Sequence, residues 1–231
     1  MEAIDQQLRV ASGLAPFCGV RQSLIEEARR SELKWSKREL AWCIADRIPG
    51  IPVETLTAVY AAAWGAWAAV CDLRFQQVAE SSRSDIVHLT RAIDGRSGTL
   101  AEAELPPGDD RRLRMWIDIG DRWHADSMLT PPTQGDLTDL LAVVSHEGGH
   151  NLGLSHEPSA RVTALMDPFY NRAIRKPQAW DIEEVQRRYG RPSAANPPTG
   201  VIPVPKEWPD KFEGVCEIFG GVYKIRFDKA L

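Results

Sequence analysis

The sequence predicts an α+β domain built on a mixed sheet. Its 231 residues are enough for one domain, or for one domain with a small appendage. Hydrophobic residues make up 43% of the chain and charged residues 26%, a composition typical of a globular protein with a packed core. The local patterns begin with a strand and a helix, continue with several strands and end with two helices, which indicates an α+β domain.

Each element of this domain is predicted from its own pattern. Apolar residues recur every three or four positions over Val53–Val70, with alanines between them, which predicts a helix. A second helix is predicted over Leu137–Leu152, where Asp136 or Asp139 could be the cap. Proline in the first turn favours a third helix over Pro177–Tyr189. Short apolar or alternating runs predict strands at Glu39–Ile44, Leu73–Val78, Ile86–Leu89, Thr99–Leu105 and Met115–Ile119.

The two ends of the chain have a different character. Residues 1–34 have a charged, helical pattern that is interrupted at Leu14–Val20. Prolines predict an extended linker over residues 191–210. After it, two alternating runs flank Gly220–Gly221, which predicts a β-hairpin within residues 211–231.

The charge balance argues against nucleic acid as a partner. The chain has 28 Lys and Arg against 32 Asp and Glu, a formal net charge of −4, whereas nucleic-acid binders usually carry a basic patch. No apolar run approaches the roughly 18 residues of a membrane span, and the first thirty residues have no signal-peptide pattern. We expect a monomer. Free thiols are expected, with two disulfides as the alternative, at Cys18, Cys43, Cys71 and Cys216.

The most informative stretch begins at His146 and reads His-Glu-Gly-Gly-His-Asn-Leu-Gly-Leu-Ser-His. On a helix, His146 and His150 lie one turn apart on the same face and can bind one metal ion. Glu147 can instead reach a water bound to that metal. Gly153 allows the sharp bend that would bring His156 back as a third ligand.

Three imidazoles with one open position are the pattern of a catalytic zinc, because structural zinc sites fill all four positions. Zinc lowers the pKa of a bound water to about 7 and polarises a carbonyl. Glu147 would take the proton of this water and deliver it to the leaving amine. The alternative is a helix with scattered surface histidines. Gly148 and Gly149 argue against it, because each costs about 1 kcal/mol relative to Ala inside a helix.

Met166 lies ten residues beyond His156, in the stretch Ala-Leu-Met-Asp-Pro-Phe-Tyr. The extended histidine motif followed by this methionine turn resembles the metzincin metalloproteases. More narrowly it resembles the matrixins, the catalytic domains of matrix metalloproteinases. The resemblance covers about residues 33–190. Further matching stretches are Lys34–Lys37, Leu152–Leu154, Asp181–Ile182, Val185–Gln186 and Tyr189–Gly190.

This resemblance implies a metzincin fold: a twisted, mostly parallel mixed sheet of about five strands with three helices, and the zinc site on the second helix. It also implies a division of the chain into an N-terminal arm, a catalytic domain, a linker and a hairpin. The corresponding ranges are residues 1–32, 33–190, 191–210 and 211–231.

The implied activity is that of a zinc-dependent endopeptidase acting on extended protein or peptide substrates, with an extracellular location. Glu147 would be the general base, and Met166 would form the floor beneath the zinc. The substrate would lie extended and pair with an edge strand near Thr99–Leu105, as an added strand. The apolar substrate residue after the scissile bond would enter a deep pocket. The residues assigned to the substrate by the resemblance are Ala142, Pro168 and Tyr170 in the pocket and Leu100 and Ala101 on the edge strand.

A calcium site is also implied, because the loop that begins at Asp94 resembles the matrixin loop that wraps this ion. Calcium prefers six to eight oxygen ligands, which carboxylates and loop carbonyls supply. A plain Asp-Gly turn beside exposed acids is the alternative. One zinc is expected rather than two, because Glu102 and Trp116 stand where the family's structural zinc has histidines. The implied calcium residues are Asp94, Gly95, Ser97, Thr99, Asp118 and Asp121.

Cys18 lies in the stretch Pro-Phe-Cys-Gly-Val-Arg, which resembles the matrixin cysteine switch. There a thiolate occupies the open position of the zinc in the latent enzyme. Phe17 stands in place of the family's arginine, and Arg21–Gln22 in place of its proline and aspartate. The alternative is a free cysteine in an N-terminal arm.

Two rival functions belong to other classes. One is a catalytically silent relative that uses the fold to bind a partner protein, although the intact Glu147 argues against it. The other gives the main role to the C-terminal hairpin, as an anchor or adhesion element. Removal of residues 191–231 would separate the second rival from a peptidase.

Overall fold

The computed structural model describes residues 16–19, 33–106, 108–125, 137–157, 162–192, 211–218 and 221–228. The chain divides into two compact units, residues 1–200 and 201–231, each of which is described by itself. Within the described stretches, no helix has both the length and the apolar character needed to cross a membrane.

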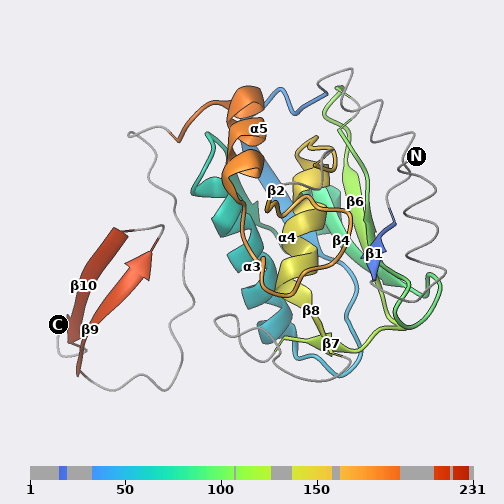
Figure 1. Cartoon of the computed structure of the whole chain (residues 1–231), viewed down its shortest axis with the longest axis horizontal. Coiled ribbons are helices and arrows are strands. Elements are labelled where there is room, and N and C mark those ends of the chain that lie inside the picture. Colours follow the sequence, from blue (N-terminus) through green and yellow to red (C-terminus); the bar gives the residue numbers. More distant parts are fainter. Residues whose placement is uncertain are drawn as a thin grey trace. The chain divides into compact units, whose positions relative to one another are not determined.

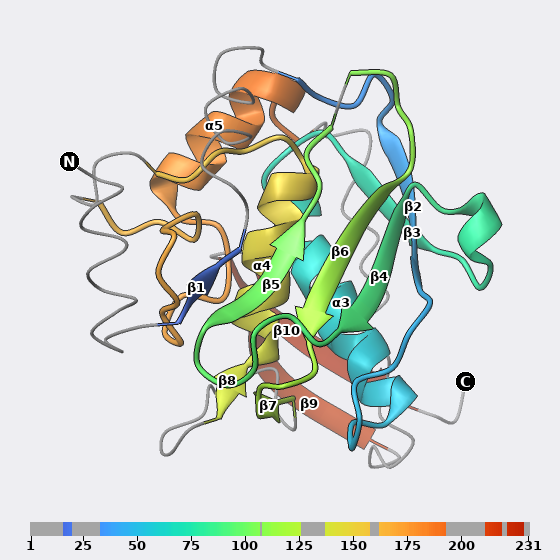
Figure 2. The ribbon, with the colours of Figure 1, turned by 90° about the vertical axis from the view of Figure 1, so that its right-hand side faces the viewer.

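The first unit is built on one six-stranded sheet (Figures 1 and 2). Its strands are β1 (Phe17–Cys18), β2 (Glu39–Ile44), β3 (Arg74–Gln77), β4 (Ile86–Arg91), β5 (Thr99–Ala103) and β6 (Leu113–Asp118). The spatial order is β1-β5-β6-β4-β2-β3. Strands β2, β3, β4 and β6 are parallel, and β5 is antiparallel to β6. The predicted mixed, mostly parallel sheet is therefore confirmed, with β1 as an additional strand beside β5.

Three helices of the described residues belong to this unit: α3 (Val53–Ala68), α4 (Leu140–Asn151) and α5 (Ala179–Tyr189). Helices α3 and α4 lie side by side on one face of the sheet (Figures 1 and 2). Helix α5 is joined to the turn after α3, where Gln186 Nε2 donates a hydrogen bond of 2.8 Å to Val70 O. Two further strands, β7 (Trp123–His124) and β8 (Thr138–Asp139), pair in parallel, and Ser81–Arg83 form one 3₁₀ turn.

Aromatic side chains fill the core between the sheet and the helices. Trp64 and Trp67 of α3 are buried, and Trp64 stacks on Phe75 with ring centroids 4.7 Å apart. His88 of β4 lies beside them and accepts a hydrogen bond of 3.1 Å from Trp64 Nε1. Burial lowers the pKa of His88 to about 3. His88 is therefore a neutral core residue at physiological pH.

The predicted elements are present, with shifted ends. Helix α4 begins at Leu140, three residues later than predicted, because the Asp139 carboxylate caps it and accepts a 2.8 Å hydrogen bond from Ala142 N–H. The alternative cap, Asp136, lies outside the described residues. So does most of the charged, helical pattern of residues 1–34, of which 16–19 and 33–34 are described.

The second unit contains the predicted hairpin. Strands β9 (Lys211–Ile218) and β10 (Gly221–Asp228) are antiparallel. The sequence pattern suggested that Gly220 and Gly221 both lie in the turn. Instead, Gly221 pairs with Ile218 and is the first residue of β10.

Candidate metal centre

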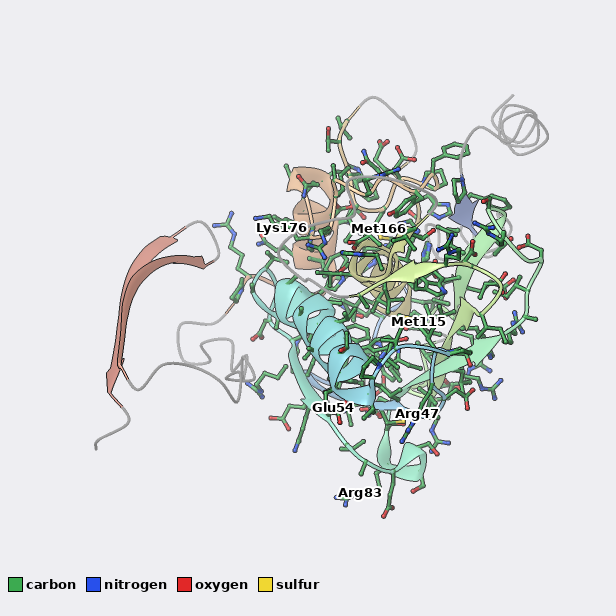
Figure 3. All side chains as sticks on the ribbon, turned by 90° about the horizontal axis from the view of Figure 1, so that it is seen from below. Arg47, Glu54, Arg83, Met115, Met166 and Lys176 are labelled. Carbon is green, nitrogen blue, oxygen red and sulfur yellow. The ribbon has the colours of Figure 1, made fainter. Side chains whose placement is uncertain are left out.

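Helix α4 carries the first two histidines of the motif and is buried along its whole length. Trp67 of α3 donates Nε1–H to Ser145 O at 2.9 Å, which ties the two helices together. A Cβ at Gly149 would collide with the sulfur of Met166, labelled in Figure 3, and one at Gly148 would lie 3.3 Å from Trp67 Nε1. The two glycines therefore allow the close packing of α4 against its neighbours.

The turn after α4 returns the chain toward the helix. Gly153 has φ +86°, and a Cβ there would collide with the backbone oxygen of Leu33. Leu154 N–H donates to Gly149 O at 2.9 Å and closes the helix end. This turn brings His156 against the two histidines of α4, with ring centroids 5.3 Å and 4.8 Å from His146 and His150.

The hydrogen bonds of the imidazoles define which nitrogens face the centre. His146 Nδ1 lies 2.7 Å from Leu165 O, and His150 Nδ1 lies 2.9 Å from Leu154 O. A carbonyl oxygen only accepts, so both Nδ1 atoms carry hydrogen. The Nε2 lone pairs of His146 and His150 are therefore available to a metal.

The arrangement fits a zinc ion. His150 Nε2 and His156 Nε2 are 3.2 Å apart, close to the spacing of about 3.3 Å expected for two nitrogens bound to one tetrahedral zinc. His146 Nε2 is buried and has no hydrogen-bond partner among the described residues. Burial lowers the pKa of His146 to about 4 and that of His150 to about 3. Both imidazoles are thus neutral at pH 7, as metal binding requires.

Glu147 is buried next to this centre. Burial raises the pKa of its carboxyl group to about 8, and a hydrogen bond from the Cys18 thiol opposes this shift. Its Oε2 atom has no hydrogen-bond partner within the described part of the chain. A buried carboxyl group with a pKa near neutrality can accept a proton and release it again.

Cys18 of β1 reaches the same centre from a distant part of the sequence. Its Sγ atom lies 3.3 Å from His150 Nε2. The ligand atoms of Cys18, His146, His150 and His156 all lie within 4.8 Å of one another, and each of these residues is buried. Among the described residues, this is the group of His, Cys, Asp and Glu that could hold a metal ion.

The turn that carries Met166 is bound to Asp181 of α5 by backbone hydrogen bonds. The Asp181 carboxylate accepts hydrogen bonds from Leu165 N–H at 2.7 Å, Met166 N–H at 3.1 Å and Gln178 N–H at 2.7 Å. Because Leu165 O is in turn the partner of His146 Nδ1, Asp181 acts on the first histidine through the backbone. The sequence showed Asp181 as a family match, and its role is visible only in these contacts.

A pocket of about 380 Å³, its open mouth included, adjoins the histidines. Its walls come from α4, β5 and the segment after Met166, and β1 lies at the pocket as well. Tyr170 Oη accepts a 2.7 Å hydrogen bond from Asp139 N–H, which fixes this wall to the start of α4. The lining includes Phe17, Leu100, Ala142, Pro168, Tyr170 and Ile174.

The comparison with known sequences identifies the family. A profile of the matrixin family matches residues 34–190. The chain belongs to the matrixin family. This match includes every described element of the first unit except β1. The family implies zinc, so a metal-dependent peptidase is the family-level function.

Several curated relatives are matrix metalloproteinases. Matrix metalloproteinase-C of Caenorhabditis elegans is 32% identical over 165 residues, which are 67% of this chain and 27% of that protein. Stromelysin-3 of Rattus norvegicus is 34% identical over 182 residues, 74% of this chain and 34% of that protein. Matrix metalloproteinase-25 of Mus musculus is 28% identical, with 88% and 38% covered. The matrixin chain thus spans less than two fifths of the length of these relatives.

The loop assigned to calcium is tightly folded in this matrixin. Asp118 is fully buried, and its carboxylate accepts hydrogen bonds from the backbone N–H groups of Ile93, Asp94 and Gly95 and from that of Gly120. Two further contacts close the loop. Asp94 accepts from Thr99 N–H at 3.0 Å, and Asp121 accepts from Ser97 N–H at 2.9 Å.

One oxygen of this loop has no partner. Asp121 Oδ2 is buried without a hydrogen bond among the described residues. The pKa of Asp121 is raised by burial and by the nearby carboxylates of Asp118 and Asp94, while the hydrogen bond from Ser97 opposes the shift. The carboxylates of Asp94, Asp118 and Asp121 therefore lie close enough together to influence one another electrostatically.

At two of the histidine positions of the family's structural zinc, this matrixin has Glu102 and Trp116 instead. Glu102 pairs with Arg91, and the Arg91 guanidinium lies over the Trp116 ring, 4.7 Å from its centroid. The indole of Trp116 has no lone pair to offer a metal, and the Glu102 carboxylate is already paired with Arg91. The residues present do not fit a second zinc site here.

Proposed function

We propose that this matrixin is a zinc-dependent endopeptidase, with His146, His150 and His156 as the zinc ligands and Glu147 as the general base. One observation carries the proposal. Three buried imidazoles meet at one point, where His146 Nε2 has no hydrogen-bond partner among the described residues, next to the Glu147 carboxyl group, whose pKa burial raises to about 8. Three protein ligands leave one position open, as in catalytic zinc sites.

The side chains have separate roles in this proposal. Bound zinc supplies Lewis-acid chemistry, polarising the scissile carbonyl and acidifying water. Glu147 accepts the proton of the attacking water at its carboxylate and then donates it to the departing amine. Met166 packs against α4 beside Gly149, and in this proposal it supports the site without being a metal ligand.

The substrate would bind as an added strand along β5. The backbone groups of this edge are already used by the segment around Cys18, because Gly19 N–H donates to Ala101 O at 2.9 Å and Phe17 N–H to Gly98 O at 3.2 Å. An extended peptide can form the same kind of bonds with Leu100 and Ala101. The pocket walls at Ala142, Pro168 and Tyr170 would take the apolar residue after the scissile bond.

Cys18 makes the chain latent in this proposal. Its thiolate would take the fourth zinc position, and the distance of 3.3 Å from Sγ to His150 Nε2 fits two ligands of one ion. The segment also covers Glu147 and thereby keeps a water from the base. Release of Cys18 would open the position for substrate.

Calcium would bind the loop of Asp94, Gly95, Ser97, Thr99, Asp118 and Asp121. The buried, unpartnered Asp121 Oδ2 atom and the neighbouring carboxylates support a cation there. Calcium should raise the melting temperature of the wild type, and Asp121→Asn should reduce that increase. An equal increase in both proteins would sink the assignment of Asp121.

The proposed partners are protein or peptide substrates, and the proposed location, from the family resemblance, is extracellular. We keep the division into an N-terminal arm (1–32), a catalytic domain (33–190), a linker (191–210) and a hairpin (211–231) as part of this proposal. A catalytically silent binding module is the rival function.

Hydrolysis of a quenched-fluorescent peptide library tests the proposal. Cys18→Ser should cleave peptides in the presence of zinc and calcium, and the double variant with Glu147→Ala should lose nearly all of that activity, because the general base contributes about 100-fold to 10,000-fold. Wild type should be slower than Cys18→Ser. Silence of Cys18→Ser with bound zinc would instead support the binding module.

A further inference from the structure

The segment Pro16–Gly19 is held from two sides. On one side, β1 pairs in parallel with β5, with Phe17 opposite Thr99 and Cys18 opposite Ala101. On the other side, Cys18 N–H donates to Pro168 O at 3.1 Å, and Tyr170 N–H donates to Pro16 O at 3.0 Å. The segment therefore bridges the edge strand and the far wall of the pocket.

Phe17 is one of the residues that line the pocket. It is half-buried, its backbone forms an isolated antiparallel β-bridge with that of Phe169, and it shares the pocket lining with Ala142 and Ile174. The Cys18 thiol lies beside the histidines, whereas Phe17 is part of the pocket lining. Two neighbouring residues thus reach two different parts of one site.

The segment lies so close to the side chains of Thr99 and Glu102 that Gly19 has no room for a side chain. A Cβ at Gly19 would collide with Thr99 Cγ2, and it would lie 2.6 Å from Glu102 Cγ. Such closeness requires a residue without a side chain. The segment is therefore seated against the strand and does not merely pass over it.

We propose that Phe17 is a second anchor of the inhibitory segment: its apolar side chain occupies part of the substrate pocket while the Cys18 thiol occupies the metal position. This inference rests on the proposed function for the identity of the pocket. Two anchors on one short segment raise the effective concentration of each at its own subsite. Loss of the aromatic anchor therefore exposes Cys18 more often, even with the thiol intact.

Alkylation of Cys18 in the full-length protein as purified tests this inference without any need for peptidase activity. The rate is followed by mass spectrometry of the Cys18 peptide after brief exposure to iodoacetamide. Phe17→Ala should raise the rate at least about tenfold, the factor that corresponds to about 1.4 kcal/mol. Phe17→Leu, which restores an apolar side chain, should return the rate most of the way to that of the wild type.

Two controls are built into the chain. Cys43 and Cys71 are each 1% exposed, so their slow alkylation in the same sample reports that the domain is still folded. Val162→Ala changes a side chain that is 47% exposed, and it should leave the Cys18 rate unchanged.

The outcomes separate this inference from the proposed function. An unchanged Cys18 rate in Phe17→Ala, with Cys43 and Cys71 still protected, would overturn the second anchor. An equally fast rate in Phe17→Leu would also contradict it. Failure of Cys18→Ser to hydrolyse peptides would count against the peptidase and leave the alkylation ratio interpretable.

Discussion

At the residue scale, the candidate centre depends on polar groups that the surrounding backbone holds in place. The two imidazoles of α4 keep their Nε2 atoms inward because backbone carbonyls hold their Nδ1 atoms. One of these carbonyls, Leu165 O, belongs to a turn whose N–H groups are bound by Asp181. The orientation of His146, a proposed metal ligand, is thus coupled through two hydrogen bonds to the Asp181 carboxylate.

Asp181→Asn tests this positioning role. An amide oxygen cannot accept all three hydrogen bonds that the carboxylate accepts, so the turn shifts and His146 loses its orientation. Zinc affinity should fall about 10-fold to 100-fold, measured by competition with a chromophoric chelator. Glu183→Gln, at an exposed position of the same helix, is the control. Equal zinc affinity in Asp181→Asn and wild type would refute the role.

His88 makes a prediction about acid stability. Burial lowers its pKa from 6.5 to about 3. Between pH 6.5 and pH 3, His88 therefore binds a proton in the unfolded chain but not in the folded chain. The stabilisation is complete above pH 6.5 and is lost as the pH falls toward 3, at up to about 1.4 kcal/mol for each pH unit.

His88→Gln keeps an acceptor for Trp64 and does not titrate. Relative to this variant, the wild type should lose about 2 kcal/mol between pH 6.5 and pH 5. Urea unfolding at both pH values measures the difference. A constant difference between the two proteins would show that the ring is protonated or exposed in the folded state.

At the scale of elements, the start of α4 is where the pocket wall is joined to the helix that carries His146 and His150. Asp139 caps the helix, is fully buried and forms an ion pair with Arg175, with Nε to Oδ1 at 3.2 Å. Its own N–H group binds Tyr170. The pocket wall and the helix that carries the histidines therefore share one residue, Asp139, as a common support.

Removal of that carboxylate should be costly. Asp139→Ala removes the carboxylate that pairs with the largely buried Arg175 and takes the cap from the helix, so the free energy of unfolding should fall by about 3 kcal/mol or more. Asp139→Asn keeps the cap and should lose less. Chemical denaturation compares the three proteins, and a loss below about 1 kcal/mol in Asp139→Ala would contradict the account.

At the scale of the whole molecule, the two units are separate by their contacts, and the family match ends at residue 190. A chain that ends at residue 200 should therefore keep the melting temperature of the first unit and the kcat/KM of the Cys18→Ser background. Thermal unfolding and peptide hydrolysis measure both. A tenfold loss of kcat/KM would give the hairpin a part in catalysis, and lost binding with full hydrolysis would favour an adhesion role.

Much of the fold could be predicted from the sequence because its signals are local. Helix α3 follows from the spacing of its apolar residues, and the His146–His156 motif lies within one helix and one turn. Strand β1 could not be predicted, since two residues become a strand only by pairing with β5. The ion pair of Asp139 with Arg175 joins residues 36 positions apart, and no local pattern contains it.

The central claim is that three histidines hold one zinc whose fourth ligand is Cys18. Zinc-edge X-ray absorption of the full-length protein, with metal analysis of the same sample, tests it most directly. The account predicts one zinc per chain with three nitrogen neighbours and one sulfur neighbour, and replacement of the sulfur by oxygen in Cys18→Ser. A wild-type spectrum without sulfur, or a chain purified in the presence of zinc that binds none, would contradict it.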